Sequence, residues 1–160
     1  LHYPLRRQRQ MCIRDRYREH VSPKFVYDRN QIMAILNQES SLMEIVKLIG
    51  SDVLPDDQKL TLEIARVIRL GFLQQNAFHQ EDTSVPMEKQ FLMMETILYL
   101  YEKCRALVNR GMPVSVLKED KIFERIIAIK YEVPNKEPER FDEYHKDIDR
   151  FYDNVLERNG

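Results

Sequence analysis

Glycine is scarce in this sequence, with only four residues among 160, at positions 50, 71, 111 and 160. The loops that hold nucleotide phosphates, GxGxxG and GxxxxGK followed by Ser or Thr, need closely spaced glycines so that backbone N–H groups can approach the phosphates. No two glycines here are close enough for either loop. The chain therefore has no segment that could hold a triphosphate by itself.

Cysteine and histidine are also few. Cys12 lies in an Arg-rich N-terminal segment and Cys104 on the apolar side of a predicted helix, which excludes a disulfide framework and fits reduced, cytosolic conditions. The four histidines have no second histidine at helical ligand spacing: His2, His20, His79 and His145. Since no Ser or Cys has a general base nearby in the sequence, we predict neither a metal site nor a catalytic residue in this chain.

Long apolar runs are absent as well. The chain is 43% hydrophobic, which is enough for one core. No run approaches the roughly 20 apolar residues of a membrane span. We expect one soluble domain without direct membrane insertion.

The N-terminal segment is basic. Residues 1–20 contain six Arg and no Lys and carry a net charge of +4, which leaves −5 on the rest of a chain whose net charge is −1. The segment lacks an apolar signal-peptide core and the interleaved aromatics of a nucleic-acid stacking platform. Its string from Met11 to Arg16 resembles translated sequencing-adaptor sequence. We expect a disordered or artefactual head that takes no part in the fold.

Two helical periods follow. Apolar residues recur every three or four positions from about 28 to 49, with Asp28 as the N-cap, and again from about 56 to 75. Gly50 can close the first helix, and Pro55, Asp56 and Asp57 suit the start of the second. The first helix is expected to bury one face, made of Ile32, Ile35, Leu36, Leu42, Ile45, Val46 and Ile49. The two helices form a helix-turn-helix hairpin with an acidic tip.

More helices are predicted after the hairpin. A wide apolar face marks 86–111 as the central core helix, and a further helical region begins at Met112-Pro113, breaks near Glu119-Asp120 and stops before Pro134. We predict an all-α, antiparallel bundle of four to five helices over residues 21–133. Residues 134–160 are a linker plus an amphipathic C-terminal helix, which should lie on the surface or against a partner. Its narrow apolar stripe consists of Phe141, Tyr144, Ile148, Phe151 and Val155.

Two details of the hairpin need a physical reason. Gly71 lies inside the second helix, where it costs up to about 1 kcal/mol relative to Ala, so we expect a local packing or bending reason. Residues 72–78 gather two aromatics and three amides. Core packing and capping at a helix end is the simpler interpretation of that cluster, and stacking on a planar ligand is the alternative.

Several segments, in order, carry a specific resemblance. They are Ser41 to Pro55, Glu63 to Arg69, Phe72 to His79, Lys89 to Met94 and Arg125 to Tyr131. Together they resemble the C-terminal helical domain of the catalytic A subunit of V/A-type rotary ATPases, over about residues 31–132. In that family a preceding domain carries the P-loop and the catalytic glutamate. The chain therefore looks like a C-terminal fragment that is inactive alone and binds no cofactor alone.

The resemblance implies a function for the full subunit. Family members bind ATP or ADP with Mg and couple hydrolysis or synthesis of ATP to proton or sodium transport, in a cytoplasmic head peripheral to the membrane. The implied partners are the central-stalk subunits and the B subunit, with no nucleic acid.

The resemblance also assigns site residues. The hairpin tip looks like the counterpart of an acidic rotor-facing loop, which makes Asp52, Val53, Leu54, Asp56 and Asp57 the expected rotor contacts. The stretch Gln75, Asn76, Ala77 and Phe78 resembles the part that closes over adenine, with Phe78 as the ring contact.

Two other functions remain open at this point. A free-standing adaptor could use the stripe over 141–155 to bind a partner helix. More remotely, the Arg-rich head could bind nucleic acid.

Overall fold

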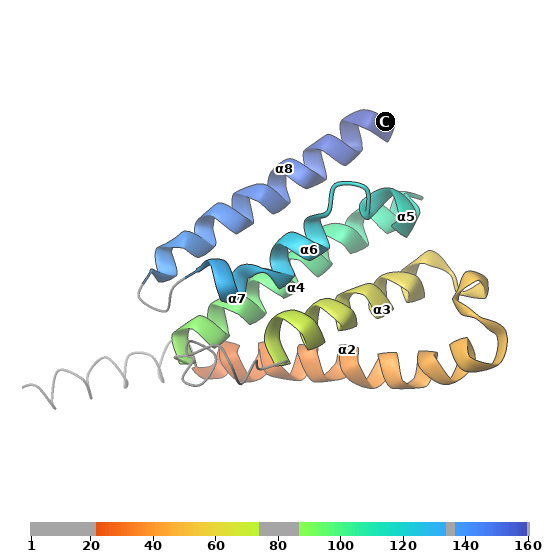
Figure 1. Cartoon of the computed structure of the whole chain (residues 1–160), viewed down its shortest axis with the longest axis horizontal. Coiled ribbons are helices and arrows are strands. Elements are labelled where there is room, and N and C mark those ends of the chain that lie inside the picture. Colours follow the sequence, from red (N-terminus) through yellow and green to blue (C-terminus); the bar gives the residue numbers. More distant parts are fainter. Residues whose placement is uncertain (1–21, 74–86, 134–136, 160) are drawn as a thin grey trace, which may run out of the picture.

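A computed structural model describes residues 22–73, 87–133 and 137–159, and the described part contains helices and turns but no strand (Figure 1). The prediction of an all-α fold is confirmed. In chain order the elements are α2 (Ser22–Ile49), the 3-10 helix η1 (Ser51–Val53), α3 (Asp56–Ile68), the π-helical turn η2 (Arg69–Leu73), α4 (Met87–Asn109), α5 (Val114–Leu117), α6 (Ile122–Ile127), α7 (Ile129–Glu132), the 3-10 helix η4 (Pro138–Arg140) and α8 (Phe141–Asn159).

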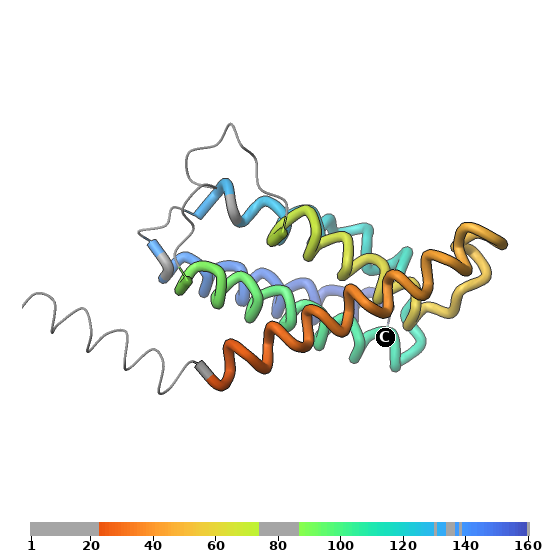
Figure 2. Tube along the Cα trace, turned by 90° about the horizontal axis from the view of Figure 1, so that it is seen from below, coloured from red at the N-terminus to blue at the C-terminus, as the bar shows by residue number. Residues whose placement is uncertain are grey.

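The central helix is α4, as predicted. It packs against α2, α3 and α8, which surround it in both ribbon and tube views (Figures 1 and 2). Its inward face is buried and mostly apolar, and includes Ile97, Leu100 and Cys104. Burial raises the pKa of the Cys104 thiol to about 12, so this cysteine is a core residue and not a reactive one.

The C-terminal end of α4 is closed by Gly111, whose φ is 94°. The N–H of Met112 donates to the carbonyl of Leu107 at 3.1 Å and the N–H of Gly111 to that of Val108 at 2.9 Å, which is the Schellman pattern. Pro113 then precedes α5. The predicted break in the following region is confirmed, because Lys121 adopts a left-handed conformation (φ 60°) between α5 and α6.

The second arm of the hairpin changes its helical form at Gly71. Arg69–Leu73 is a π-helical turn that continues α3, and Gly71 is buried against α6. A Cβ on Gly71 would lie 3.2 Å from the Cα of Ile127. The expected local reason for this glycine is its close packing against α6.

The start of α2 differs from the prediction. Asp28 was expected to be its N-cap, and this was wrong, because the helix already begins at Ser22 and Asp28 lies inside it with 2% of its surface exposed. Pro23 provides the physical reason, since its fixed φ suits the first turn of a helix.

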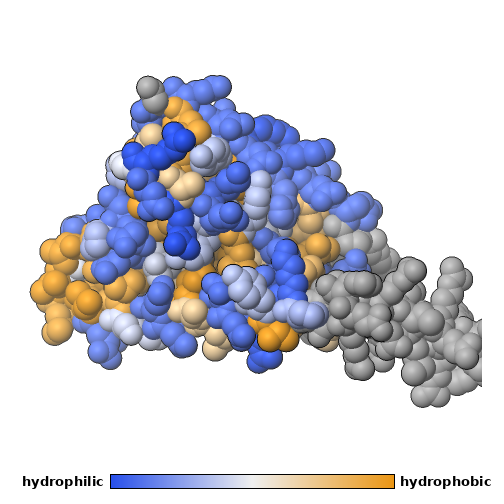
Figure 3. Space-filling model, turned by 180° about the vertical axis from the view of Figure 1, so that it is seen from behind, coloured by the Kyte–Doolittle hydropathy of each residue, from blue (hydrophilic) through white to orange (hydrophobic). Residues whose placement is uncertain are grey.

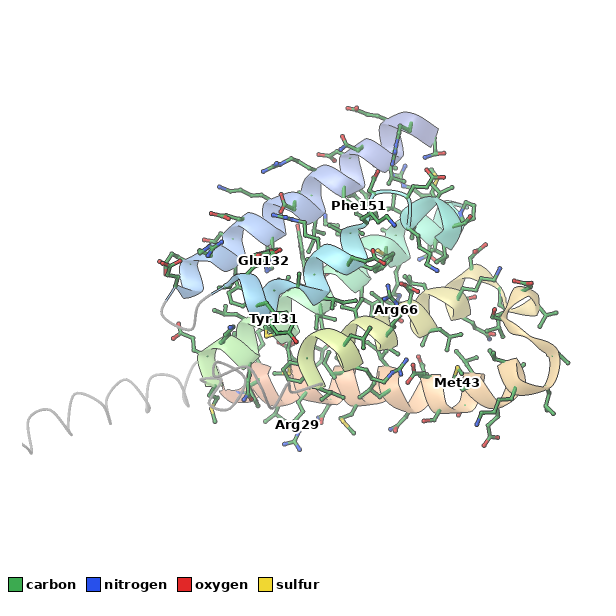
Figure 4. The ribbon with its side chains drawn as sticks, viewed as in Figure 1. Arg29, Met43, Arg66, Tyr131, Glu132 and Phe151 are labelled. Atoms are coloured by element: carbon green, nitrogen blue, oxygen red, sulfur yellow. The ribbon has the colours of Figure 1, made fainter. Side chains whose placement is uncertain are left out.

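The apolar stripe of α8 is buried in the chain's own core. Phe141, Tyr144, Ile148, Phe151 and Val155 are all at most 4% exposed, and α8 packs against α4 and α6. Figure 4 shows Phe151 pointing from α8 into the bundle. Of the two predicted placements of the last helix, the structure shows the one on the bundle surface. The adaptor hypothesis requires an exposed stripe that a partner helix could bind, and this stripe is buried.

Some expectations fall on residues that the structure does not describe. The basic head, residues 1–20, and most of the linker after Val133 lie outside the described residues. Within the described part, no helix combines the length and the apolar character needed to cross a membrane.

We predict that Gly71→Val lowers the free energy of unfolding by about 2 kcal/mol or more, because the new side chain would overlap the α6 backbone at Ile127. The measurement is thermal unfolding followed by circular dichroism. Leu70→Val, at the neighbouring exposed position, is the control for the helix propensity of valine. Equal melting temperatures for the two variants would show that α6 moves aside at no cost.

Candidate functional site

The turn of the hairpin is built by local backbone bonds. Gly50 has φ 86°, and its N–H donates to the carbonyl of Val46 at 2.8 Å, which ends α2. The 3-10 helix η1 follows, and the N–H of Leu54 returns to the carbonyl of Ser51 at 3.2 Å. Pro55 then precedes α3, whose first turn carries Asp56 and Asp57 next to the positive end of the helix dipole.

The five residues expected to face the rotor do not share one environment. Asp52, Val53 and Asp57 are exposed, whereas Leu54 is 6% exposed and lies in the core. Asp56 is half-buried, and its Oδ1 accepts a hydrogen bond of 3.1 Å from the backbone N–H of Val114. Asp56 therefore holds the start of α3 to the start of α5, and Asp52 and Val53 are the members presented at the turn itself.

A cluster of exposed apolar side chains occupies the last two turns of α2 and the turn that follows it. We call it the apolar tip cluster, and it comprises Met43, Ile45, Leu48, Ile49 and Val53. Leu48 is 85% exposed, Ile49 62% and Val53 59%. Figure 3 shows apolar side chains gathered at the end of the molecule that the turn occupies.

Ile45 and Ile49 were expected on the buried face of the first helix, and this was wrong. The reason is length: α2 has 28 residues and spans about 42 Å, whereas α3 has 13 and spans about 20 Å. The end of α2 and the turn project beyond the other helices in two perpendicular views (Figures 1 and 2). A sequence signal existed, because apolar residues occupy six of the eight positions from 42 to 49 and cannot all fit one helix face.

The base of the hairpin is held by burial and by ion pairs. Ile64, Ala65, Val67 and Ile68 of α3 are each 0% exposed. Arg69 of η2 forms an ion pair of 2.7 Å with Glu39 of α2, which ties the two arms together.

A second set of ion pairs fixes α3 to its other neighbours. Arg66 points toward α6 (Figure 4) and pairs with Glu63 of its own helix and, at 3.1 Å, with Glu124 of α6. Lys118, in the segment after α5, places its Nζ 3.6 Å from Oε2 of Glu63. The arm that carries the turn is therefore braced at its root.

The adenine-side residues Gln75, Asn76, Ala77 and Phe78 lie outside the described residues. The described chain reaches Leu73 at the end of η2, and in the sequence these residues begin two positions after it. Across 22–73, 87–133 and 137–159, no three His, Cys, Asp or Glu side chains form a group that could hold a metal ion.

Comparison with known proteins gives a consistent result. The family described as "C-terminal domain of V and A type ATP synthase" matches residues 14–116. The V-type ATP synthase alpha chain 2 of Clostridium tetani is 41% identical over 151 residues, which cover 94% of this chain and 26% of the relative. The A subunit of the A-type ATP synthase of Methanopyrus kandleri is 43% identical over 130 residues, covering 81% of this chain and 22% of the relative.

A third relative, the V-type ATP synthase alpha chain of Halothermothrix orenii, is 41% identical over 140 residues that cover 88% of this chain and 24% of its own length. The chain thus spans about a quarter of the relatives that it matches, and the family match covers more than half of the chain. This protein belongs to the family of C-terminal domains of V- and A-type ATP synthases.

Proposed function

We propose that this chain is the lever domain of a rotary ATP synthase catalytic subunit, in which the hairpin tip bears on a central rotor. The apolar tip cluster carries the proposal, since it places exposed aliphatic side chains at the projecting end of two helices whose base is buried and ion-paired. Large exposed apolar patches on soluble proteins are typical of interaction surfaces.

The chemistry of the contact follows from relative magnitudes. Burying an exposed aliphatic side chain stabilises a complex by about 1.5–3 kcal/mol, whereas an exposed ion pair contributes about 0–1 kcal/mol. Five exposed aliphatic or thioether side chains lie at the end of α2 and on the turn, where Asp52 is also exposed. The apolar cluster is therefore the main adhesive element in our proposal, and the acidic residues contribute orientation and solubility.

The hairpin could also transmit movement from the nucleotide to the tip. In the proposed mechanism, residues 75–78 close over the adenine of a nucleotide held by the preceding domain of the full subunit, with Phe78 against the ring. Because this stretch begins two positions after the end of η2 in the sequence, its closure would move the braced α3 and so the tip.

We extend the proposal to the whole protein on the strength of its relatives, which are named as alpha chains of V-type and A subunits of A-type ATP synthases. The full subunit would bind ATP or ADP with Mg and couple its chemistry to proton or sodium transport. It would work with the central stalk and the B subunit in a cytoplasmic head peripheral to the membrane. This chain alone would be inactive.

The double variant Leu48→Ser with Ile49→Ser tests the tip in an assembled complex that contains the full-length subunit. We expect roughly a hundredfold or greater loss of rotor affinity, since about 1.5–3 kcal/mol is lost for each of the two aliphatic contacts removed. The measurement is the number of ions pumped per ATP hydrolysed, which should fall.

Two controls make the tip experiment specific. Met33→Ser removes an exposed apolar side chain from the same helix far from the tip, and should leave coupling unchanged. Asp52→Asn should reduce coupling less than the double variant does, and its effect on coupling should disappear as the salt concentration rises. Wild-type coupling in the double variant would contradict the assignment of the tip as the rotor contact.

The adenine-side assignment has its own test. Phe78→Ala in the full-length subunit should weaken nucleotide affinity by up to about tenfold, because an aromatic stacking contact contributes about 0.5–1.5 kcal/mol. Binding of a fluorescent ATP analogue measures this. His79→Ala, the adjacent position, is the control, and equal affinities for the two variants would remove Phe78 from the pocket.

A further inference from the structure

Asp28 is an unusual residue for its position. It lies in the second turn of α2 with 2% of its surface exposed, and its Oδ2 has no hydrogen-bond partner among the described residues. Buried carboxylates are normally paired or hydrogen-bonded through both oxygens. An orphaned buried oxygen indicates that the ionised form is not the resting form of this group.

A second carboxylate lies beside Asp28. Glu95 of α4 lies within hydrogen-bonding reach of Asp28 across the α2–α4 interface. Lys24, one turn before Asp28, forms an ion pair of 2.8 Å with Glu95 Oε1, and its own side chain is 59% exposed. The interface therefore holds two carboxylates and one directly engaged cation.

The surroundings of the pair include other charged groups. A hollow of about 380 Å³ adjoins it, and Glu102 and Arg105 of α4 and Tyr27 of α2 line this hollow. The guanidinium of Arg105 lies 5.4 Å from the centre of the Tyr101 ring. The hollow also gives the pair a route to solvent.

The third helix at this place contributes a neutral group. His145 of α8 lines the same hollow, and burial lowers its pKa. The hydroxyl of Thr96 donates to the carbonyl of Leu92 at 2.8 Å, so it accepts from His145 Nε2 at 3.2 Å. A hydrogen bond to Asp149 raises the pKa of Tyr99, which stacks on His145, to about 12. Neither ring supplies a positive charge to the carboxylates at neutral pH.

Two carboxylates at hydrogen-bonding distance cannot both ionise cheaply when one of them is buried. A single proton between them removes the conflict, because the O–H of Asp28 then donates to Glu95 while Glu95 keeps its ion pair with Lys24. Burial, and then the contact with Glu95, raise the pKa of Asp28 to about 7.

We propose that Asp28 and Glu95 form a proton-binding site at the α2–α4 interface, which holds one proton on the acid side of neutral pH and loosens the N-terminal half of α2 when that proton is lost as pH rises. The proton leaves to water through the adjoining hollow, and two negative charges then face each other while Lys24 is paired with Glu95. If α2 is an arm of the lever, which rests on the proposed function, the stiffness of the lever depends on pH.

The sign of the effect on stability follows from linkage. An acid whose folded pKa lies above its unfolded pKa binds more protons in the folded state. Its contribution to the free energy of unfolding therefore falls as pH rises from the unfolded pKa through the folded pKa. His145 acts in the opposite direction, since a base with a lowered pKa loses stability on acidification. A comparison of variants that share His145 cancels its contribution.

The test is the difference in melting temperature between Asp28→Asn and the wild-type 160-residue chain as a function of pH. We expect the smallest difference below about pH 4, where Asp28 is protonated in both the folded and the unfolded chain and resembles Asn, and a melting temperature several degrees higher for Asp28→Asn at about pH 8.5. Asp153→Asn, an exposed position of α8, should give a difference that does not change with pH. A pH-independent difference for Asp28→Asn would overturn the proposal.

A direct titration covers the case in which Asp28→Asn fails to fold. In ¹³C NMR of the wild-type chain, the Asp28 carboxyl should titrate near neutral pH, and in Glu95→Gln its midpoint should move to lower pH. A midpoint in the ordinary range for aspartate would overturn the proposal. Both measurements report on the isolated interface, so they can succeed even if the tip has no rotor to contact.

Discussion

The burial of α3 is the constraint on which the other helices depend. Its residues from Ile64 to Ile68 include four that have no exposed surface, and α2, α4 and α6 all pack against it. Among them, Ile64, Val67 and Ile68 each contribute about 1.5–3 kcal/mol through removal of apolar surface from water. Because α3 is fixed in this way, the C-terminal end of α2 can project beyond the core and remain helical. The π-helical turn after α3 can likewise hold Gly71 against the α6 backbone.

An apolar contact at the hairpin tip suits the proposed function, in which the tip bears on a turning surface. The hydrophobic effect is non-directional, so an apolar contact keeps most of its strength when the surface beneath it turns, whereas a hydrogen bond needs a fixed partner and angle. Asp52 and Lys47 flank the aliphatic side chains and keep the free tip hydrated. Asp56, which sequence alone groups with Asp52, instead braces the turn through the backbone of Val114.

The sequence predicts most of the fold and only part of the site. Helical periods locate the long helices, and Gly50 and Gly111 mark two helix ends, because these signals are local. The start of α2 was misplaced because Pro23 and Asp28 both carry N-terminal signals, and only packing decides between them. The exposure of Ile45 and Ile49 depends on how far α2 outruns α3, which periodicity does not encode. Residues 75–78 remain a prediction from resemblance, outside the described chain.

Asp28, which the sequence wrongly predicts as the N-cap of α2, has a different chemistry inside the helix. As an N-cap it would have been a solvated carboxylate with a backbone N–H for a partner. Inside the helix it faces Glu95, and an ionised pair there would usually be less stable than two well-packed apolar residues. A bound proton changes that comparison, since a group whose pKa lies near 7 is protonated at little cost at neutral pH. The interface can therefore hold two acidic residues on facing helices and stay packed, provided that the pH does not rise far above neutral.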